Sequence, residues 1–171
     1  METNFKIGDT VVYGVNGVCS ISEKCEICFI KGEKAHEYLI LTPCGDGKSK
    51  IYIPTDKEEL LSRIHRIMTE DEISELLQEA KDADMPAAMD KTARNLMLDQ
   101  AVQNGDRGMV LGLIRYLLKE GENQKNISKK MLFSDENLLK SAQKTILDEF
   151  SFVLNKTQSD TEDYIKTQLE I

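Results

Sequence analysis

Residues 5–19 set the architecture of the N-terminal half of the chain, and they read Phe5-Lys6-Ile7-Gly8-Asp9-Thr10-Val11-Val12-Tyr13-Gly14-Val15-Asn16-Gly17-Val18-Cys19. Val11, Tyr13 and Val15 recur at the two-residue period of a strand with one buried face. The pair Asn16-Gly17 tolerates positive φ and is a common signal for a short hairpin turn. The pattern predicts a β-hairpin whose return strand covers residues 18–21.

Short β-prone runs continue as far as Pro54. They predict strands at residues 26–30, 37–42 and 50–54, the last being the final strand of the half. Within that final strand, Ile51 and Ile53 face one side, and Lys50 and Tyr52 face the other. Strands this short and this close in sequence favour a small curled β-barrel.

A helical period replaces the strand period near residues 66–69, which places a domain boundary there and leaves His65 in a linker. Thr69 and Glu72 have the spacing of a capping box. Asn104-Gly105 suits a left-handed helix end, and Asp106 suits the start of the next helix, which Gly121 is expected to close. Apolar stripes predict helices following Thr69, opening at Pro86, following Asp106 and starting at Ser134 or Asp135, with a weak helix in residues 157–171. The expected fold class is α+β, with a small N-terminal β-barrel in residues 1–66 and an all-α domain in residues 67–171.

Composition is that of an ordinary globular protein. The 171 residues are 40% hydrophobic and 30% charged. No apolar run approaches the ~18 residues of a membrane span, and Met1-Glu2-Thr3-Asn4 does not resemble a secretion signal. We therefore expect a cytoplasmic protein without membrane association, whose four cysteines stay reduced.

The net charge of −8 is unevenly distributed. Residues 1–66 have nine Lys or Arg and ten Asp or Glu, a net charge of −1. Residues 67–171 have 13 and 20, a net charge of −7. Proteins that bind DNA usually neutralise phosphates with a basic face, so any DNA contact of the helical half should be local and weak.

The sequence offers little for catalysis. Cys25 and Cys28 form a C-x-x-C, but residues three apart on a strand point to opposite faces, so small half-buried side chains are favoured over a zinc or redox site. Two histidines, with no recognisable nucleophile, phosphate-binding loop or dinucleotide motif, favour a protein that is not an enzyme. We expect no catalytic residues, no cofactor and no metal.

Two short segments have alternative interpretations. The strand at residues 50–53 is either an edge open to a partner's strand or a strand paired within the barrel. Lys91 and Arg94, three residues apart on one helix face, belong either to a solvated surface or to a contact with DNA backbone.

The chain resembles the CarD/CdnL transcription regulators, whose N-terminal module is shared with the transcription-repair coupling factor. The resemblance covers most of residues 4–155. Its motifs are, in order, residues 5–13, Gly17-Val18, Ile21, 30–33, 37–41, 51–54, 104–106, Val110, 114–117, 128–132, Ala142 and 147–149.

The resemblance implies a Tudor-like barrel that docks on the RNA polymerase β-subunit lobe, and a helical domain that meets promoter DNA at the upstream edge of the bubble through a tryptophan wedge and basic residues. This chain has no Trp. The wedge position falls near Lys91, and Arg94 is retained from the basic cluster. The polymerase-gripping arginines of the family fall near Cys28 and Tyr52.

We therefore predict a polymerase-binding transcription regulator with weak contact to upstream promoter DNA. The alternative is a divergent protein-interaction module that has lost DNA binding, and metal analysis would test a third possibility, a thiol or zinc site at Cys25 and Cys28. The predicted DNA-contacting residues are Lys91 and Arg94. The predicted polymerase-contacting residues are Ile27, Cys28, Phe29, Lys50, Ile51, Tyr52 and Ile53.

Overall fold

The fold is taken from a computed structural model, which describes residues 5–28, 34–45, 47–82, 90–127 and 129–170. The chain divides into two compact units, Met1–Ile67 and Met68–Ile171. We call them the N-terminal unit and the helical unit, and each is described by itself.

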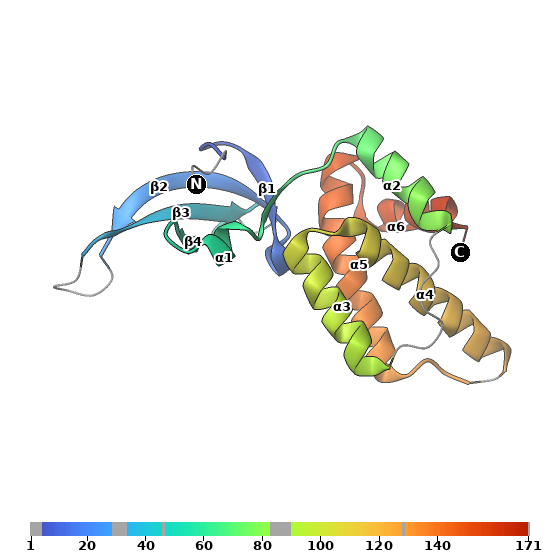
Figure 1. The fold of residues 1–171 in the computed structure, drawn as a ribbon. Helices are drawn as coiled ribbons and strands as arrows, with labels where there is room; N and C mark the ends of the chain where they lie inside the picture. Colours follow the sequence, from blue (N-terminus) through green and yellow to red (C-terminus); the bar gives the residue numbers. More distant parts are fainter. Residues whose placement is uncertain (1–4, 29–33, 46, 83–89, 128, 171) are drawn as a thin grey trace. The chain divides into compact units, whose positions relative to one another are not determined.

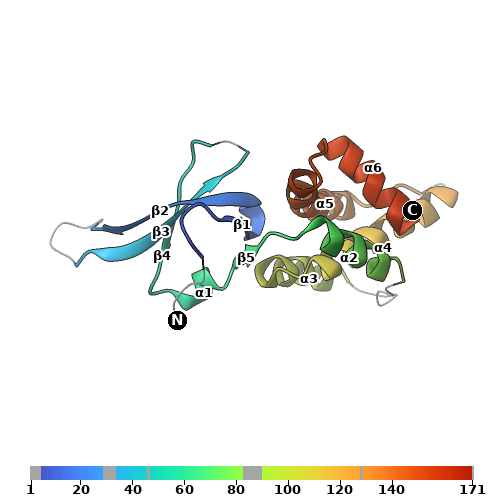
Figure 2. The same ribbon diagram turned by 90° about the horizontal axis from the view of Figure 1, so that it is seen from above.

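The N-terminal unit is a five-stranded antiparallel sheet with one short helix. The strands are ordered β4-β3-β2-β1-β5, so β4 and β5 lie at the two edges (β4 is labelled in Figure 1 and β5 in Figure 2). The barrel expected from the sequence is therefore not closed in the described residues, and its Tudor-like character stays a prediction. The elements are β1 (Thr10–Tyr13), β2 (Val18–Ile27), β3 (His36–Pro43), β4 (Ile51–Pro54), α1 (Glu58–Leu61) and β5 (Ile64–Arg66).

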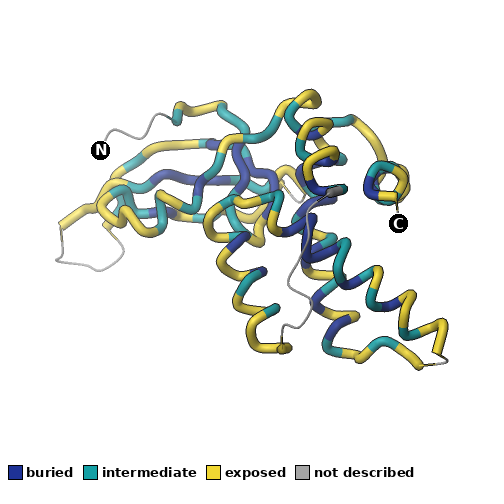
Figure 3. Tube along the Cα trace, turned by 45° about the vertical axis from the view of Figure 1, so that its right-hand side comes forward, coloured by how far each residue is buried: buried dark blue, intermediate teal, exposed yellow. Residues whose placement is uncertain are grey.

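One face of this sheet carries the core of the unit. Directly opposed residues of antiparallel strands point the same way, so the row Ile21, Leu41 and Ile51 lies on one face. Leu60 and Leu61, the last two residues of α1, pack against this face. Figure 3 shows burial concentrated in the middle of the strands, with exposed residues toward the far end of the β2–β3 hairpin. The buried members of the core are Val11, Cys19, Ile21, Leu39, Leu41, Ile53 and Ile64.

The first hairpin differs from the expected two-residue turn. Gly14–Asn16 form a 3-10 turn, and it is Gly14 and Gly17 that adopt positive φ, at 49° and 68°. The N–H of Tyr13 donates to the carbonyl of Gly17 at 3.0 Å, which closes the loop. The return strand is also longer than expected: β2 runs for ten residues, and a bulge at the Ile21/Glu23 step replaces the expected break before residue 26.

Strand β5 is not among the strands predicted from the sequence. Ile64 lies opposite Tyr13 and is 5% exposed, and His65, expected in a solvated linker, lies opposite Val12 on β1. The final strand is thus β5 rather than β4. Three residues are too few to show a period of two, and the partner strand lies some fifty residues away in sequence.

The helical unit is built around α4. Seven residues of α4, from Val110 to Gly121, are buried, and this helix contacts α2, α3 and α5. Figure 2, the view from above, shows α2 and α6 close to α4. Apolar burial of this kind is the main driving force for packing helices. The helices are α2 (Glu70–Asp82), α3 (Lys91–Asn104), α4 (Arg107–Asn126), α5 (Phe133–Val153) and α6 (Gln158–Leu169).

The predicted helix ends are mostly confirmed. The N–H of Thr69 donates to Glu72 at 2.8 Å, and the N–H of Glu72 donates to the Thr69 hydroxyl at 3.3 Å, which is a complete capping box. Asp106 accepts the N–H of Met109 at 2.9 Å. Gly105 ends α3 with a φ of 67°. Local sequence therefore determines where these helices begin and end.

Three predicted ends are wrong or fall outside the described residues. Helix α4 does not stop at Gly121 but continues to Asn126. A Cβ on Gly121 would lie 2.7 Å from the Cε of Met131, so the flexible end of that side chain would have to move aside. Helix α3 begins at Lys91 with Asp90 as its cap, and Pro86 lies outside the described residues. Helix α5 begins at Phe133, one residue before the earlier of the two predicted starts, Ser134 and Asp135.

Candidate functional site

Strand β4 lies at an edge of the described sheet and pairs with β3 on its inner side. The N–H of Thr55 donates to the carbonyl of Glu37 at 2.9 Å. Because hydrogen-bonded pairs alternate along antiparallel strands, the main-chain groups of Ile53 point toward β3, whereas those of Tyr52 point toward the outer edge. This edge is the arrangement that strand addition by a partner requires.

The side chains of β4 divide as the sequence predicted. Ile53 is 1% exposed and belongs to the core, and Ile51 packs against that core. Tyr52 is 42% exposed on the opposite face. Of the predicted contact residues on β4, Tyr52 is thus the one whose side chain can reach a partner.

The pairing of β2, β3 and β4 places further side chains on the same face of the sheet as Tyr52. Tyr52 lies opposite Ile40, Tyr38 lies opposite both Cys25 and Pro54, and Ile27 lies opposite His36. Opposed residues share a face, as do residues two apart along a strand. We call this surface the outer face and define it by Cys25, Ile27, Tyr38 and Tyr52; Ile40 lies on the same side of the sheet but is only 2% exposed.

Ile27 and Tyr52 were predicted as contact residues from separate strands, and the register brings them to one face. Tyr38 was not predicted, because its place beside Tyr52 follows from the register between β3 and β4, which spacing along the sequence does not reveal. Cys28 follows β2 and is exposed, and Phe29 lies outside the described residues.

One charged pair lies on the same side of the sheet as the outer face, and a second pair lies on the opposite side. Lys50 Nζ lies 3.2 Å from Glu23 Oε1, and this hydrogen bond raises the pKa of Lys50. On the other side of the sheet, Lys24 lies 3.1 Å from Glu37, and hydrogen bonds from Lys24 and Thr55 lower the pKa of Glu37. Exposed pairs of this kind contribute little to stability, so a partner can replace them at small cost.

The two predicted DNA-contacting residues have different surroundings. Lys91 is exposed at the first position of α3. The guanidinium of Arg94 donates to Asp135 at 2.6 Å, and the two side chains are only 12% and 6% exposed. Arg94 therefore joins α3 to α5 inside the helical unit, which argues against a DNA contact by this residue.

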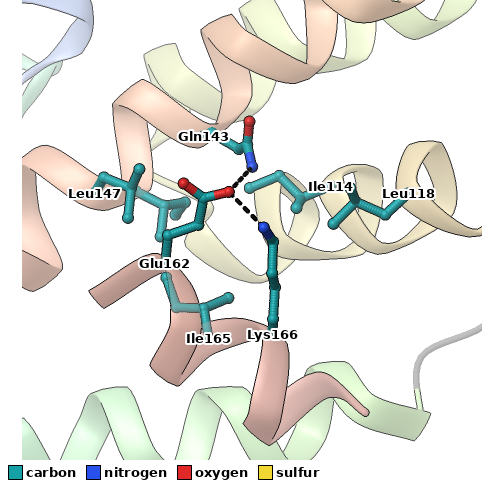
Figure 4. Close-up of a pocket in the computed structure, with 8 residues that line it drawn as sticks. Ile114, Leu118, Gln143, Leu147, Glu162, Ile165 and Lys166 are labelled. Carbon is teal, nitrogen blue, oxygen red and sulfur yellow. Dashed lines mark hydrogen bonds and ion pairs between the residues drawn. The ribbon is translucent and has the colours of Figure 1, made fainter. Parts of the chain in front are cut away.

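The described residues contain no group of three or more His, Cys, Asp or Glu that could hold a metal ion. A small cavity lies between α4, α5 and α6, where Glu162 accepts hydrogen bonds from Gln143 and Lys166 at its rim (Figure 4). Its volume of about 10 Å³ has room for no more than one water molecule. In the core of the N-terminal unit, burial raises the pKa of the Cys19 thiol to about 11, which makes it a poor nucleophile.

These features describe a domain with an edge strand and an adjacent, partly apolar face. A comparison with protein families matches residues 5–66 to the CarD-like/TRCF RID domain. The N-terminal unit is therefore a CarD-like/TRCF RID domain, an RNA polymerase-interacting module associated with transcription. A comparison with curated proteins found no significant match.

None of the described helices combines the length and the hydropathy needed to cross a membrane.

Proposed function

We propose that this protein is a non-enzymatic transcription regulator that docks on the β-subunit lobe of RNA polymerase through the edge of β4 and the outer face. The observation that carries the proposal is the coincidence of the RID match with an edge strand in the same residues. Strand addition would supply main-chain hydrogen bonds, and Tyr52, Tyr38 and Ile27 would supply side-chain contacts on the adjoining face.

The helical unit is proposed to reach upstream promoter DNA weakly. Lys91 supports this part, because it is exposed at the start of α3. The net charge of −7 over residues 67–171 requires such a contact to be local. We include in this proposal the cytoplasmic location that the sequence predicts.

The docking half is tested by measuring how tightly the full-length protein binds purified polymerase β lobe, with immobilised lobe and titrated protein. Tyr52→Glu places a charge at the outer edge and should weaken binding at least tenfold. Val15→Glu is the matched control, because it adds the same charge at a 76% exposed apolar position on the β1–β2 turn of the same unit. Equal binding by wild type and Tyr52→Glu would place the docking surface elsewhere.

A second function is supported by the Arg94–Asp135 pair, which occupies one of the two predicted DNA contacts. In this alternative the protein is an interaction module that has lost DNA binding. A promoter-DNA mobility shift with and without polymerase separates the two functions. A salt-sensitive gain in DNA affinity that depends on the helical unit counts against the alternative.

A further inference from the structure

The most exposed large apolar side chains in the described part of the helical unit lie in the connection between α4 and α5. Phe133 is 76% exposed, Ile127 is 63% exposed and Leu132 is 61% exposed. Lys129 and Lys130 are exposed in the same connection. We call Ile127, Lys129, Lys130, Leu132 and Phe133 the α4–α5 patch. Burial of large apolar side chains is favourable, so a partner that covers this patch gains free energy.

Hydrogen bonds hold the backbone of the patch at both ends. The carbonyl of Gln124 accepts the N–H of Ile127 at 3.2 Å and the N–H of Lys129 at 2.8 Å. The carbonyl of Leu132 accepts the N–H of Asp135 at 2.9 Å, and Asp135 itself is 5% exposed in the first turn of α5. Because this backbone is already ordered, the entropic cost of binding a partner is reduced.

Charge indicates the chemistry of that partner. Residues 124–133 contain three lysines and no acidic residue, although residues 67–171 have a net charge of −7. The patch therefore combines exposed apolar side chains with a local positive charge. The complementary surface combines apolar side chains with negative charges.

The same charge pattern favours a short acidic protein segment over a nucleic acid. Glu122 and Glu136 are exposed on either side of the lysines. Duplex DNA has one negative charge per ~1.7 Å of its axis, so it would extend past the lysines over these carboxylates. A protein segment can confine its own carboxylates to the lysines. Ile127 and Leu132 are also aliphatic, whereas stacking on bases uses aromatic side chains.

The lack of a strand edge in the described helical unit indicates the conformation of the segment. The secondary structure described there consists of helices α2 to α6, so the unit offers no edge with which an extended peptide could pair. An α-helix satisfies its own main-chain hydrogen bonds and needs none from the surface that it covers. An amphipathic helix presents apolar side chains at i, i+3, i+4 and i+7 on one face.

We propose that the α4–α5 patch is a docking site for an acidic amphipathic helix of another protein. The apolar face of that helix covers Ile127, Leu132 and Phe133, and its Asp and Glu side chains lie beside Lys129 and Lys130. This inference goes beyond the docking proposed for β4, because it assigns a separate protein contact to the helical unit.

The test measures the binding of synthetic peptides to the full-length protein by fluorescence anisotropy. The probe is a fluorescein-labelled peptide of about four helical turns, with leucines at i, i+3, i+4 and i+7 and with Asp and Glu beside them. One control peptide has the same composition with its leucines spread around the helix. A second control peptide has Lys in place of every Asp and Glu. The probe should bind about tenfold more tightly than either control peptide.

The apolar half of the contact is tested at Phe133. Phe133→Ala should lower the affinity for the probe about tenfold, because it removes the most exposed aromatic side chain of the patch. Phe152→Ala is the matched control, since Phe152 is 50% exposed near the other end of α5, roughly 28 Å from Phe133 at 1.5 Å per residue. The control should bind the probe like wild type. Both side chains are exposed, so both variants should remain folded.

The lysines should account for the salt dependence of binding. Lys129→Gln combined with Lys130→Gln should weaken probe binding at low salt and have a smaller effect at high salt, because salt screens exposed charges. Lys140→Gln combined with Lys144→Gln is the control, since it removes the same charge from exposed positions further along α5. The control should weaken binding much less than the change in the patch.

Four results would overturn the inference. The first is equal binding of the three peptides by wild type, and the second is equal probe binding by Phe133→Ala and Phe152→Ala. The third is tighter binding of a fluorescent single-stranded oligonucleotide than of the probe, lost in Phe133→Ala, which would make the patch a nucleic-acid contact. The fourth is a wild-type dimer in sedimentation experiments that Phe133→Ala converts to a monomer, which would assign the patch to a second copy of the chain.

The peptide assay contains no polymerase, and its variants leave the N-terminal unit unchanged. Its outcome is therefore independent of the Tyr52→Glu experiment, so failure of this inference and failure of docking through β4 are distinguishable.

Discussion

Arg107 at the start of α4 holds Glu149 on α5 with two hydrogen bonds, from Nε to Oε2 at 2.9 Å and from a terminal nitrogen to Oε1 at 3.0 Å. The N–H of Met68 donates to the same carboxylate at 3.0 Å. Glu149 is 1% exposed, so three donors satisfy a charge that has left water. This carboxylate fixes the first residue of the helical unit to the ends of two of its helices.

Arg107→Ala should lower the free energy of unfolding by about 3–5 kcal/mol, because it leaves the buried Glu149 carboxylate without its charged partner. Urea denaturation of the full-length protein measures the loss. Lys144→Ala is the control, since Lys144 pairs with Asp148 at 2.8 Å on the exposed side of α5. Loss of that pair should lower the free energy of unfolding by no more than about 1 kcal/mol. Similar losses in the two variants would contradict a structural role for the buried pair.

Arg94→Ala should also be strongly destabilising, by about 3–5 kcal/mol, because Asp135 is 5% exposed and would be left unpaired. Replacing both partners, in Arg94→Leu with Asp135→Leu, should recover most of the loss, since no buried charge then remains. The stable double variant allows DNA binding to be measured without the complication of unfolding. Wild-type DNA affinity in that variant would assign Arg94 a structural role, and a clear loss would restore it as a DNA contact.

Gly121→Ala should behave differently in two backgrounds. In the wild type, the ~1 kcal/mol gained in helix propensity is reduced by the displacement of the flexible Met131 side chain, whose Cε would lie 2.7 Å from the new Cβ. In a Met131→Ala background the clash is absent, and Gly121→Ala should stabilise by about 1 kcal/mol. A double-mutant cycle by urea denaturation measures the coupling. Equal effects of Gly121→Ala in both backgrounds would show that residues 121 and 131 are not coupled.

The Cys19 thiol should resist labelling in the folded protein. Its pKa is raised from 9.0 to about 11, chiefly by burial, so it stays protonated at pH 8. An aromatic disulfide reagent should therefore modify the other thiols first and reach Cys19 on unfolding. Because the folded pKa exceeds the unfolded one, this thiol's contribution to stability is complete below pH 9 and is lost as pH rises toward 11. A Cys19→Ser variant should remove the slow labelling phase, and rapid labelling of all four cysteines at pH 8 would contradict the prediction.

Local signals predicted much of the fold. The capping box at Thr69, the cap at Asp106 and the helix end at Gly105 are confirmed because each depends on residues within one turn of the chain. The opposite faces of Ile53 and Tyr52 followed from the two-residue period of a strand.

The features that were missed depend on residues far apart in sequence. Strand β5 is stabilised by its pairing with β1, and Gly121 lies inside α4, opposite Met131, rather than at a helix end. The Arg94–Asp135 pair joins residues 41 positions apart, so no spacing rule could show that a predicted DNA contact is buried. The bulge in β2 brings Cys25 and Ile27 to the outer face, and Tyr38 lies there through the register between β3 and β4.

Strand β4 is only four residues long, with Lys50 before it and Pro54 as its last residue. Charged residues, proline and short length are devices that keep an edge from pairing indiscriminately, so they guard the sheet against fibre-like growth. In the proposed docking, they also limit the partner's strand to a handful of main-chain hydrogen bonds. Selectivity between partners would then depend on how well their side chains fit around Tyr52.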